Sequence, residues 1–139
     1  MLEQALDRYP RDPEVLTHLG FLYDQIDKDR RAAVLYERAL EVDPEAAVAV
    51  SNLAVIYASR GDLEKALPLW KRSFAEDPGR SEVGMDLALG LCKSGDAAGA
   101  RETLIEVLRH NPDLGRARAM LREVDSAPGD CGSAVPLHR

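Results

Sequence analysis

A 34-residue repeat constrains the fold of this chain more than any other feature of its sequence. Residues of the same type recur at this spacing: Leu19, Leu53 and Leu87; Ala32, Ala66 and Ala100; Pro44, Pro78 and Pro112. Gly61 and Gly95 share the same spacing. A fixed period of this length is typical of stacked structural repeats rather than of one closed core. Each repeat has room for two helices of about 13 residues and two short turns.

Apolar residues within each repeat have helical spacing, which predicts two helices per repeat. First helices are expected around residues 15–23, 49–57 and 83–91, and second helices around residues 30–42, 63–76 and 97–110. Asp-Pro or Asn-Pro pairs are expected to cap the helix that opens the next repeat. Gly61-Asp62 and Gly95-Asp96 are expected to form the turn inside a repeat. Small residues are expected where the two helices cross, at Gly20, Ala54, Ala88, Ala32, Ala66 and Ala100. The fold class predicted is all-α, a solenoid of antiparallel helix pairs.

The pattern of large, small and aromatic residues resembles that of the tetratricopeptide repeat family. The residues that carry the resemblance are Leu16, Leu19, Gly20, Tyr23, Ala32, Tyr36, Ala39 and Pro44 in the first repeat, Val50, Leu53, Ala54, Tyr57, Ala66, Trp70, Ser73 and Pro78 in the second, and Gly84, Leu87, Ala88, Leu91, Ala100, Leu104, Val107 and Pro112 in the third. The sequence departs from the family at Asp27, where glycine is usual, and the third repeat matches less closely. The resemblance implies a right-handed superhelix whose first helices line a concave groove that binds extended peptides or a partner helix.

The predicted organisation places three repeats between two different ends. Residues 1–10 are expected to form the second helix of a preceding, truncated repeat, and the repeats follow at residues 13–46, 47–80 and 81–114. Residues 115–125 are expected to form a capping helix with a polar, arginine-bearing outer face. Residues 126–139 are small, polar and Pro/Gly-containing, and are expected to be disordered. The chain is therefore expected to be the C-terminal part of a longer repeat protein, unless its first helix is covered in another way.

Composition disfavours several classes of partner. A net charge of −6 works against binding the phosphate backbone of nucleic acid. No apolar run approaches the length of a membrane span, and the N-terminal residues lack the features of a signal peptide. Cys92 and Cys131 fit neither a disulfide framework nor metal-binding spacing. The compartment stays unknown, and a soluble protein of the cytoplasm, or of the periplasm if the parent protein is exported, is expected.

No constellation of residues in the sequence predicts catalysis, a metal site or a cofactor. His18, His110 and His138 fall in different parts of the repeat, without a partner at helical spacing. Cys92 is expected to be a small packing residue, and Trp70 is expected to lie in the core. The tripeptide Arg60-Gly61-Asp62 is known from integrin ligands, but here it occupies the turn of the repeat.

The groove implied by the resemblance defines the candidate binding residues: Thr17, His18, Phe21, Asp24, Ser51, Asn52, Val55, Ser59, Glu82, Met85, Asp86, Leu89 and Lys93. Phe21, Val55 and Leu89 form an apolar row, which either marks an interaction site or is half-buried between neighbouring first helices. Some family members clamp ligand carboxylates with lysine, asparagine and arginine. Those positions read Thr17, Phe21, Asn52, Glu82 and Asp86 here, and only Asn52 fits. The expected ligand is therefore a neutral, apolar or basic segment.

Three functions are compatible with these observations. The main hypothesis is a non-enzymatic scaffold that binds a protein or peptide partner in its groove. One alternative is self-association, through the N-terminal helix or through the groove. Another is an accessory domain of a larger enzyme or cofactor protein, with the chemistry located elsewhere in the parent chain.

Overall fold

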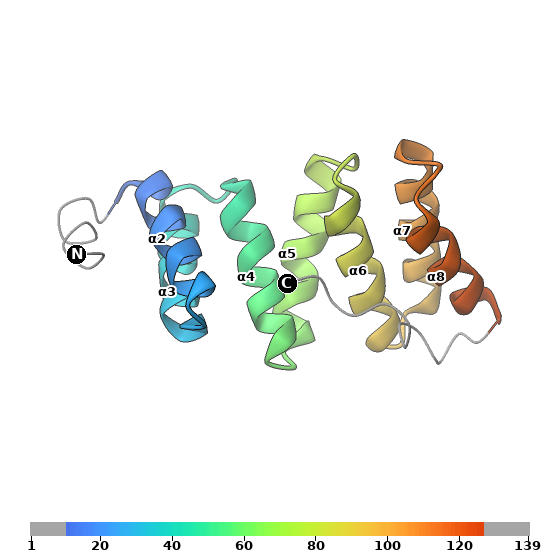
Figure 1. The fold of residues 1–139 in the computed structure, drawn as a ribbon, viewed down its shortest axis with the longest axis horizontal. Helices are drawn as coiled ribbons and strands as arrows, with labels where there is room; N and C mark the ends of the chain where they lie inside the picture. The colour runs from blue at the N-terminus through green and yellow to red at the C-terminus, as the bar shows by residue number, and fades with distance from the viewer. Residues whose placement is uncertain (1–10, 127–139) are drawn as a thin grey trace. The chain divides into compact units, whose positions relative to one another are not determined.

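The computed structural model describes residues 11–126, and within that range every regular element is an α-helix (Figure 1). The helices are α2 (Pro13–Gln25), α3 (Asp29–Val42), α4 (Ala47–Ser59), α5 (Leu63–Glu76), α6 (Ser81–Lys93), α7 (Ala97–His110) and α8 (Gly115–Ser126). The starts of α2, α4, α6 and α8 follow one another at the period of the sequence repeat. The all-α fold of paired helices predicted from the sequence is confirmed.

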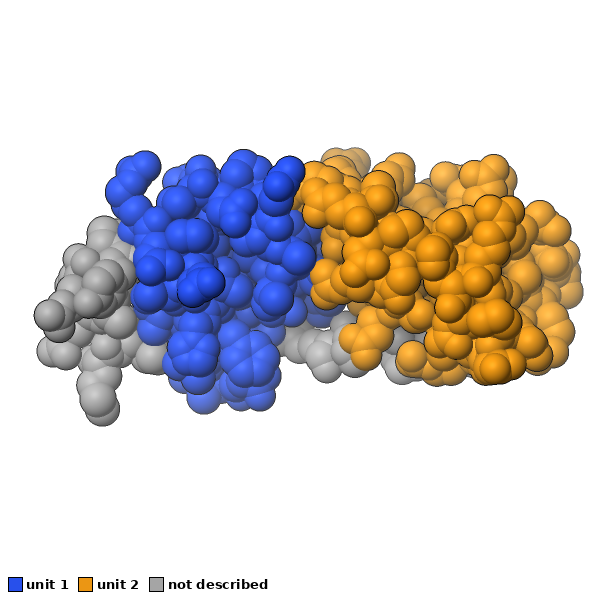
Figure 2. Space-filling view, turned by 90° about the horizontal axis from the view of Figure 1, so that it is seen from above, with its two compact units in different colours: residues 1–56 blue, residues 57–139 orange. Residues whose placement is uncertain are grey.

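The chain divides into two compact units, Met1–Ile56 and Tyr57–Arg139, which Figure 2 colours separately. The boundary between them falls within α4. In the first unit α2 packs against α3. In the second unit α5 packs against α6, α6 against α7, and α7 against α8. Each unit is therefore built from consecutive helices that contact their neighbours in the sequence.

Helices approach closely where the sequence supplies small residues. In the first unit, a Cβ atom at Gly20 would lie 2.7 Å from Cε1 and 2.8 Å from Cδ1 of Tyr36, so α2 and α3 touch at this point. The alanines predicted to lie at helix crossings have no exposed surface: Ala32, Ala54, Ala66, Ala88 and Ala100. The aromatic position of the repeat is also buried. Both Tyr36 and Trp70 are shielded from solvent, which confirms Trp70 as a core residue.

The turn inside each repeat uses a residue with left-handed backbone geometry. Gly61 and Gly95 have φ angles of 80° and 96°, and Asp27 has a φ of 59° at the corresponding place. In each turn, the residue after the left-handed residue donates its N–H to the carbonyl oxygen that lies four residues before the left-handed residue. The three N···O distances are 2.8 to 2.9 Å. Asp27 therefore makes the same turn as the two glycines, although its Cβ atom disfavours that conformation.

The prolines of the repeat lie before the helices rather than at their first position. Helices α4, α6 and α8 begin three residues after Pro44, Pro78 and Pro112. The prediction that these prolines open the next helix is therefore wrong. It holds only for Pro13, which occupies the first turn of α2.

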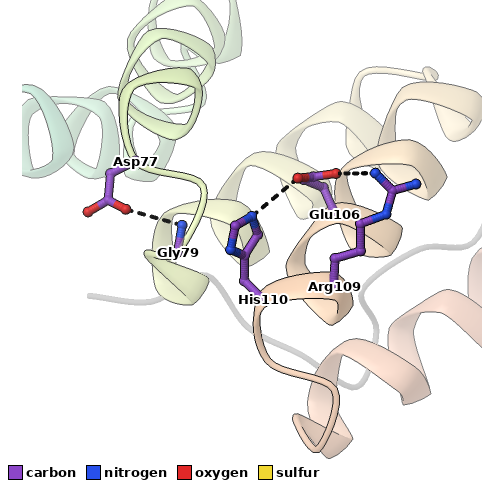
Figure 3. Close-up of polar contacts among 5 residues, drawn as sticks. All are labelled: Asp77, Gly79, Glu106, Arg109 and His110. Atoms are coloured by element: carbon purple, nitrogen blue, oxygen red, sulfur yellow. Dashed lines mark hydrogen bonds and ion pairs between the residues drawn. The ribbon is translucent and has the colours of Figure 1, made fainter.

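The acids that precede these prolines bond within the loops. The Oδ1 atom of Asp43 accepts from the N–H of Glu45 at 3.0 Å, and Oδ1 of Asp77 accepts from the N–H of Gly79 at 3.2 Å (Figure 3). Both contacts lie ahead of the following helix. Asp12, which precedes Pro13 at the start of α2, does cap its helix as predicted, because its carboxylate accepts from two N–H groups of the first turn.

The predictions for the two ends of the chain fall largely outside the described residues. This applies to the helix expected at residues 1–10, to self-association through it, and to the disorder expected beyond residue 126. Helix α8 extends through Ser126, one residue further than the predicted capping helix. Among residues 11–126, no helix combines the length and the apolar character that crossing a membrane requires.

Candidate functional site

A pocket of about 400 Å³ opens on the first unit, between α2 and the start of α4. Its walls come from Pro13, Glu14, Thr17, His18 and Phe21 on α2, and from Asp43, Ala46, Ala47 and Val48 at the α3–α4 loop and the first turn of α4. Three of the predicted groove residues, Thr17, His18 and Phe21, therefore line one pocket. Asp43, Ala46 and Ala47 were missed by the sequence analysis, because the helical pattern gives no information on how the loop folds.

The pocket combines exposed apolar side chains with acidic ones. Phe21 is 44% exposed and Val48 is 53% exposed, and both belong to the few large apolar residues that stand out from the described surface. Glu14 and Asp43 supply carboxylates to the same lining. The lining is therefore both apolar and negatively charged.

Asn52 is engaged in a hydrogen bond within the first unit. Its Nδ2 donates to the hydroxyl oxygen of Tyr36 at 3.2 Å, which joins α4 to α3. The pKa of Tyr36 is raised to about 12, because burial disfavours the phenolate; the Asn52 hydrogen bond lowers the pKa and the charge of Asp24 raises it. Tyr36 therefore keeps its proton at neutral pH and can accept from Asn52.

The predicted groove residues differ in exposure from one helix to the next. His18, Phe21, Ser59, Glu82 and Lys93 are exposed; Thr17, Asp24, Ser51, Asn52 and Val55 are half-buried; Met85, Asp86 and Leu89 are buried. The apolar row expected from the sequence thus runs from an exposed Phe21 to Leu89 at 1% exposure. Leu89 is a buried residue of α6 rather than an open contact surface.

Cys92, near the end of α6, is buried and takes part in a disulfide bond. The prediction that Cys92 is a small packing residue agrees with this burial. The chain has two cysteines, at positions 92 and 131, and their spacing matches no familiar disulfide motif.

A cluster of charged side chains lies at the end of α7 in the second unit (Figure 3). Glu106 accepts from Nη1 of Arg109 at 3.1 Å, and its other oxygen lies 3.2 Å from Nε2 of His110. The expectation that no histidine has a partner at helical spacing is therefore wrong for His110. These contacts lie at the surface of one helix and contain no nucleophile. Within residues 11–126, no group of three or more His, Cys, Asp or Glu side chains is placed to hold a metal ion.

Comparisons with known proteins point to one kind of repeat. Two family models, both described as tetratricopeptide repeat, match residues 58–124 and residues 28–81. An uncharacterized protein, ycf37 of Porphyra purpurea, is 51% identical over 39 residues, which make up 28% of this chain and 22% of that protein. The chain thus corresponds to about a fifth of that relative's length.

Solved structures share the fold over most of the chain. A structure of MamA has a TM-score of 0.81 at 25% identity, covering 92% of this chain and 70% of MamA. The first TPR of Spaghetti (RPAP3), bound to the HSP90 peptide SRMEEVD, has a TM-score of 0.76 at 19% identity, covering 85% of this chain and 94% of that one. The similarity in each case is that of helical repeats.

Proposed function

This chain belongs to the tetratricopeptide repeat family, and we propose that it is a non-enzymatic scaffold that holds a protein or peptide segment on the first helices of its repeats. The pocket of the first unit carries the proposal. It places the exposed side chains of Phe21 and Val48 around a space of about 400 Å³, which is within the size range of small binding pockets. The peptide held by the TPR of Spaghetti (RPAP3) supports this use of the fold.

The charge of the pocket defines the chemistry of the ligand. Glu14 and Asp43 lie in the lining, and carboxylates of a ligand would be repelled there. Asn52 matches the carboxylate-clamp pattern of the family, but its amide is already bonded to Tyr36 at 3.2 Å. That bond takes up one of the two N–H donors of the amide. We therefore infer an apolar segment that is neutral or basic, bound with a Kd on the order of micromolar, or about −8 kcal/mol.

Three peptides of equal length test this function directly. One carries lysines beside apolar residues, the second carries glutamates in place of the lysines, and the third is SRMEEVD, the peptide bound to the relative. Each is titrated into the full chain by fluorescence anisotropy at two salt concentrations. We expect the lysine peptide to bind about tenfold more tightly than the other two, with a preference that weakens at high salt. Equal binding of all three, or tighter binding of SRMEEVD, would contradict the proposal.

A further inference from the structure

The pocket of the first unit receives carboxylates from two separate elements. Glu14 lies in the first turn of α2, and Asp43 directly follows the last residue of α3. Both side chains belong to the lining of the same space of about 400 Å³. A cleft lined by charges of one sign concentrates their electric field. The two carboxylates therefore attract a positively charged group into the pocket.

Both carboxylates remain available to such a group. The Oδ1 atom of Asp43 accepts from the N–H of Glu45 at 3.0 Å, which holds the carboxylate in place and does not neutralise its charge. Within residues 11–126, no ion pair joins Asp43 or Glu14 to a basic side chain. A cation that enters the pocket therefore does not have to displace one that belongs to the first unit.

The apolar part of the lining lies further along α2. Glu14 and Phe21 are seven residues apart, which places them on one face of the helix and about 10.5 Å apart along its axis. Phe21 is 44% exposed, and Val48 in the first turn of α4 is 53% exposed. A side chain with an apolar stem and a cationic head matches a lining of this kind.

The aromatic ring and the two carboxylates favour arginine over lysine. A guanidinium group is planar, stacks on aromatic rings and has five N–H donors in fixed directions, so it can bond to two carboxylates at once. It is also less strongly hydrated than an ammonium group, and it loses less on entering a pocket that is partly shielded from water.

We propose that the pocket is an arginine-binding site for a peptide segment of a partner protein. Asp43 and Glu14 bond to the guanidinium group, while the stem of the arginine and its apolar neighbours pack on Phe21 and Val48. This inference rests on the proposed function and adds to it the side chain that anchors the partner.

The two carboxylates are expected to contribute unequally. Glu14 is exposed and Asp43 is half-buried. Ion pairs at an exposed position add little to affinity, whereas charge-assisted hydrogen bonds in a shielded position add more. Together they are expected to make an arginine segment bind about fivefold more tightly than a lysine segment, with Asp43 responsible for most of the difference.

Three peptides that differ at one position test the site. That position carries arginine, lysine or asymmetric dimethylarginine in an otherwise uncharged apolar segment, and each peptide is titrated into the full chain by fluorescence anisotropy. Because His18 also lines the pocket, the titrations are run at pH 8, where histidine side chains are neutral. Dimethylation keeps the positive charge but blocks bidentate hydrogen bonding. We expect the arginine peptide to bind about fivefold more tightly than the other two, and equal affinities would overturn the proposal.

Substitution of each carboxylate tests whether the pocket makes this distinction. Asp43→Asn removes the charge but keeps an oxygen that accepts from Glu45, and Glu14→Gln keeps the length of the side chain. Asp43→Asn should abolish most of the preference for arginine, and Glu14→Gln should reduce it. Glu41→Gln is the matched control, because it removes the same charge from an exposed residue of α3 outside the lining. A preference that survives Asp43→Asn, or that Glu41→Gln reduces equally, would overturn the proposal.

Failure of the arginine site and failure of the proposed function give different results. Phe21→Ala with Val48→Ala removes apolar contacts that all three peptides share, and it should weaken the binding of all three. If it does so while the unsubstituted chain binds the three peptides equally, the scaffold function stands and the arginine site is wrong. If none of the three peptides binds, both are wrong.

Discussion

The side-chain amide of Asn52 on α4 donates a hydrogen bond to the hydroxyl of Tyr36 on α3, across 3.2 Å. The bond connects the second helix of one repeat to the first helix of the next. Tyr36 has no exposed surface, so the contact satisfies a polar group that water does not reach. It also uses one of the two N–H donors of the Asn52 amide.

Replacement of Tyr36 by phenylalanine should change how stability depends on pH. The pKa of Tyr36 is about 12 in the folded chain against an ordinary 10.0. The stabilising contribution is therefore complete below about pH 10 and is lost as the pH rises towards 12, because only the unfolded chain then releases the proton. Urea unfolding should show Tyr36→Phe less stable at pH 8, by about 0.5–1.5 kcal/mol from the lost hydrogen bond, with the difference shrinking above pH 10. A difference that stays constant with pH would contradict the account.

Addition of a methyl group at Gly20 should destabilise the first unit. The new Cβ atom would lie 2.7 Å from a ring carbon of Tyr36, so α2 and α3 would have to separate or the ring would have to move. We expect Gly20→Ala to lower the free energy of unfolding by about 1–3 kcal/mol. Gly115→Ala is the matched control, since no atom lies within 4 Å of the place that its new Cβ atom would take, and alanine there should be neutral or slightly stabilising. If both substitutions changed the free energy of unfolding equally, the close approach of α2 and α3 at Gly20 would be ruled out.

Two substitutions at the turns, Asp27→Gly and Gly61→Ala, should have opposite effects on stability. Asp27 has a φ of 59°, a geometry that costs a residue with a Cβ atom about 1–2 kcal/mol. Glycine removes this strain at the cost of backbone entropy, so Asp27→Gly is expected to stabilise the chain by about 0.5–1 kcal/mol. Gly61→Ala, at a φ of 80°, is expected to destabilise it by about 1 kcal/mol. Thermal unfolding of the two variants checks both signs, and a destabilising Asp27→Gly would mean that the aspartate makes a contact worth more than the strain.

Two positions of the predicted apolar row should respond differently to truncation. Leu89 is buried, whereas Phe21 is exposed. Leu89→Ala is therefore expected to cost about 2–5 kcal/mol of stability, as in other cores. Phe21→Ala should cost under about 1 kcal/mol, because much of its ring already contacts water. Denaturant titration distinguishes them; similar losses would mean that the two residues share one environment.

The period of the sequence was sufficient to predict the helices and their pairing. Leu19 and Ala32 recur because stacked helix pairs need a large residue and a small one at fixed places, and this requirement does not depend on distant parts of the chain. The prediction of a turn at Asp27 was less firm, because the other two repeats have glycine at this position. The structure nevertheless gives it the same left-handed geometry as Gly61 and Gly95, because the flanking helices determine the turn.

Contacts between elements were not predictable in the same way. The pairing of Asn52 with Tyr36 spans 16 residues and depends on how α4 lies on α3, which no local pattern encodes. The pocket lining from Asp43 to Val48 depends on a loop in which the helix begins three residues after Pro44. Burial of Leu89 was one of two alternatives for the apolar row, and burial of Met85 was missed, because helical periodicity shows which residues share a face and not what covers that face.

The most direct test of the account compares two pairs of substitutions in the lysine-peptide titration. Phe21→Ala with Val48→Ala removes apolar side chains from the pocket, and Ile26→Ala with Val34→Ala removes side chains of similar exposure (57% and 52%) that lie outside its lining. The account predicts that the first pair weakens binding about tenfold or more, while the second pair leaves the Kd unchanged and both keep the helical circular-dichroism signal. Equal binding by the two double variants would contradict the assignment of this pocket as the site that holds the partner.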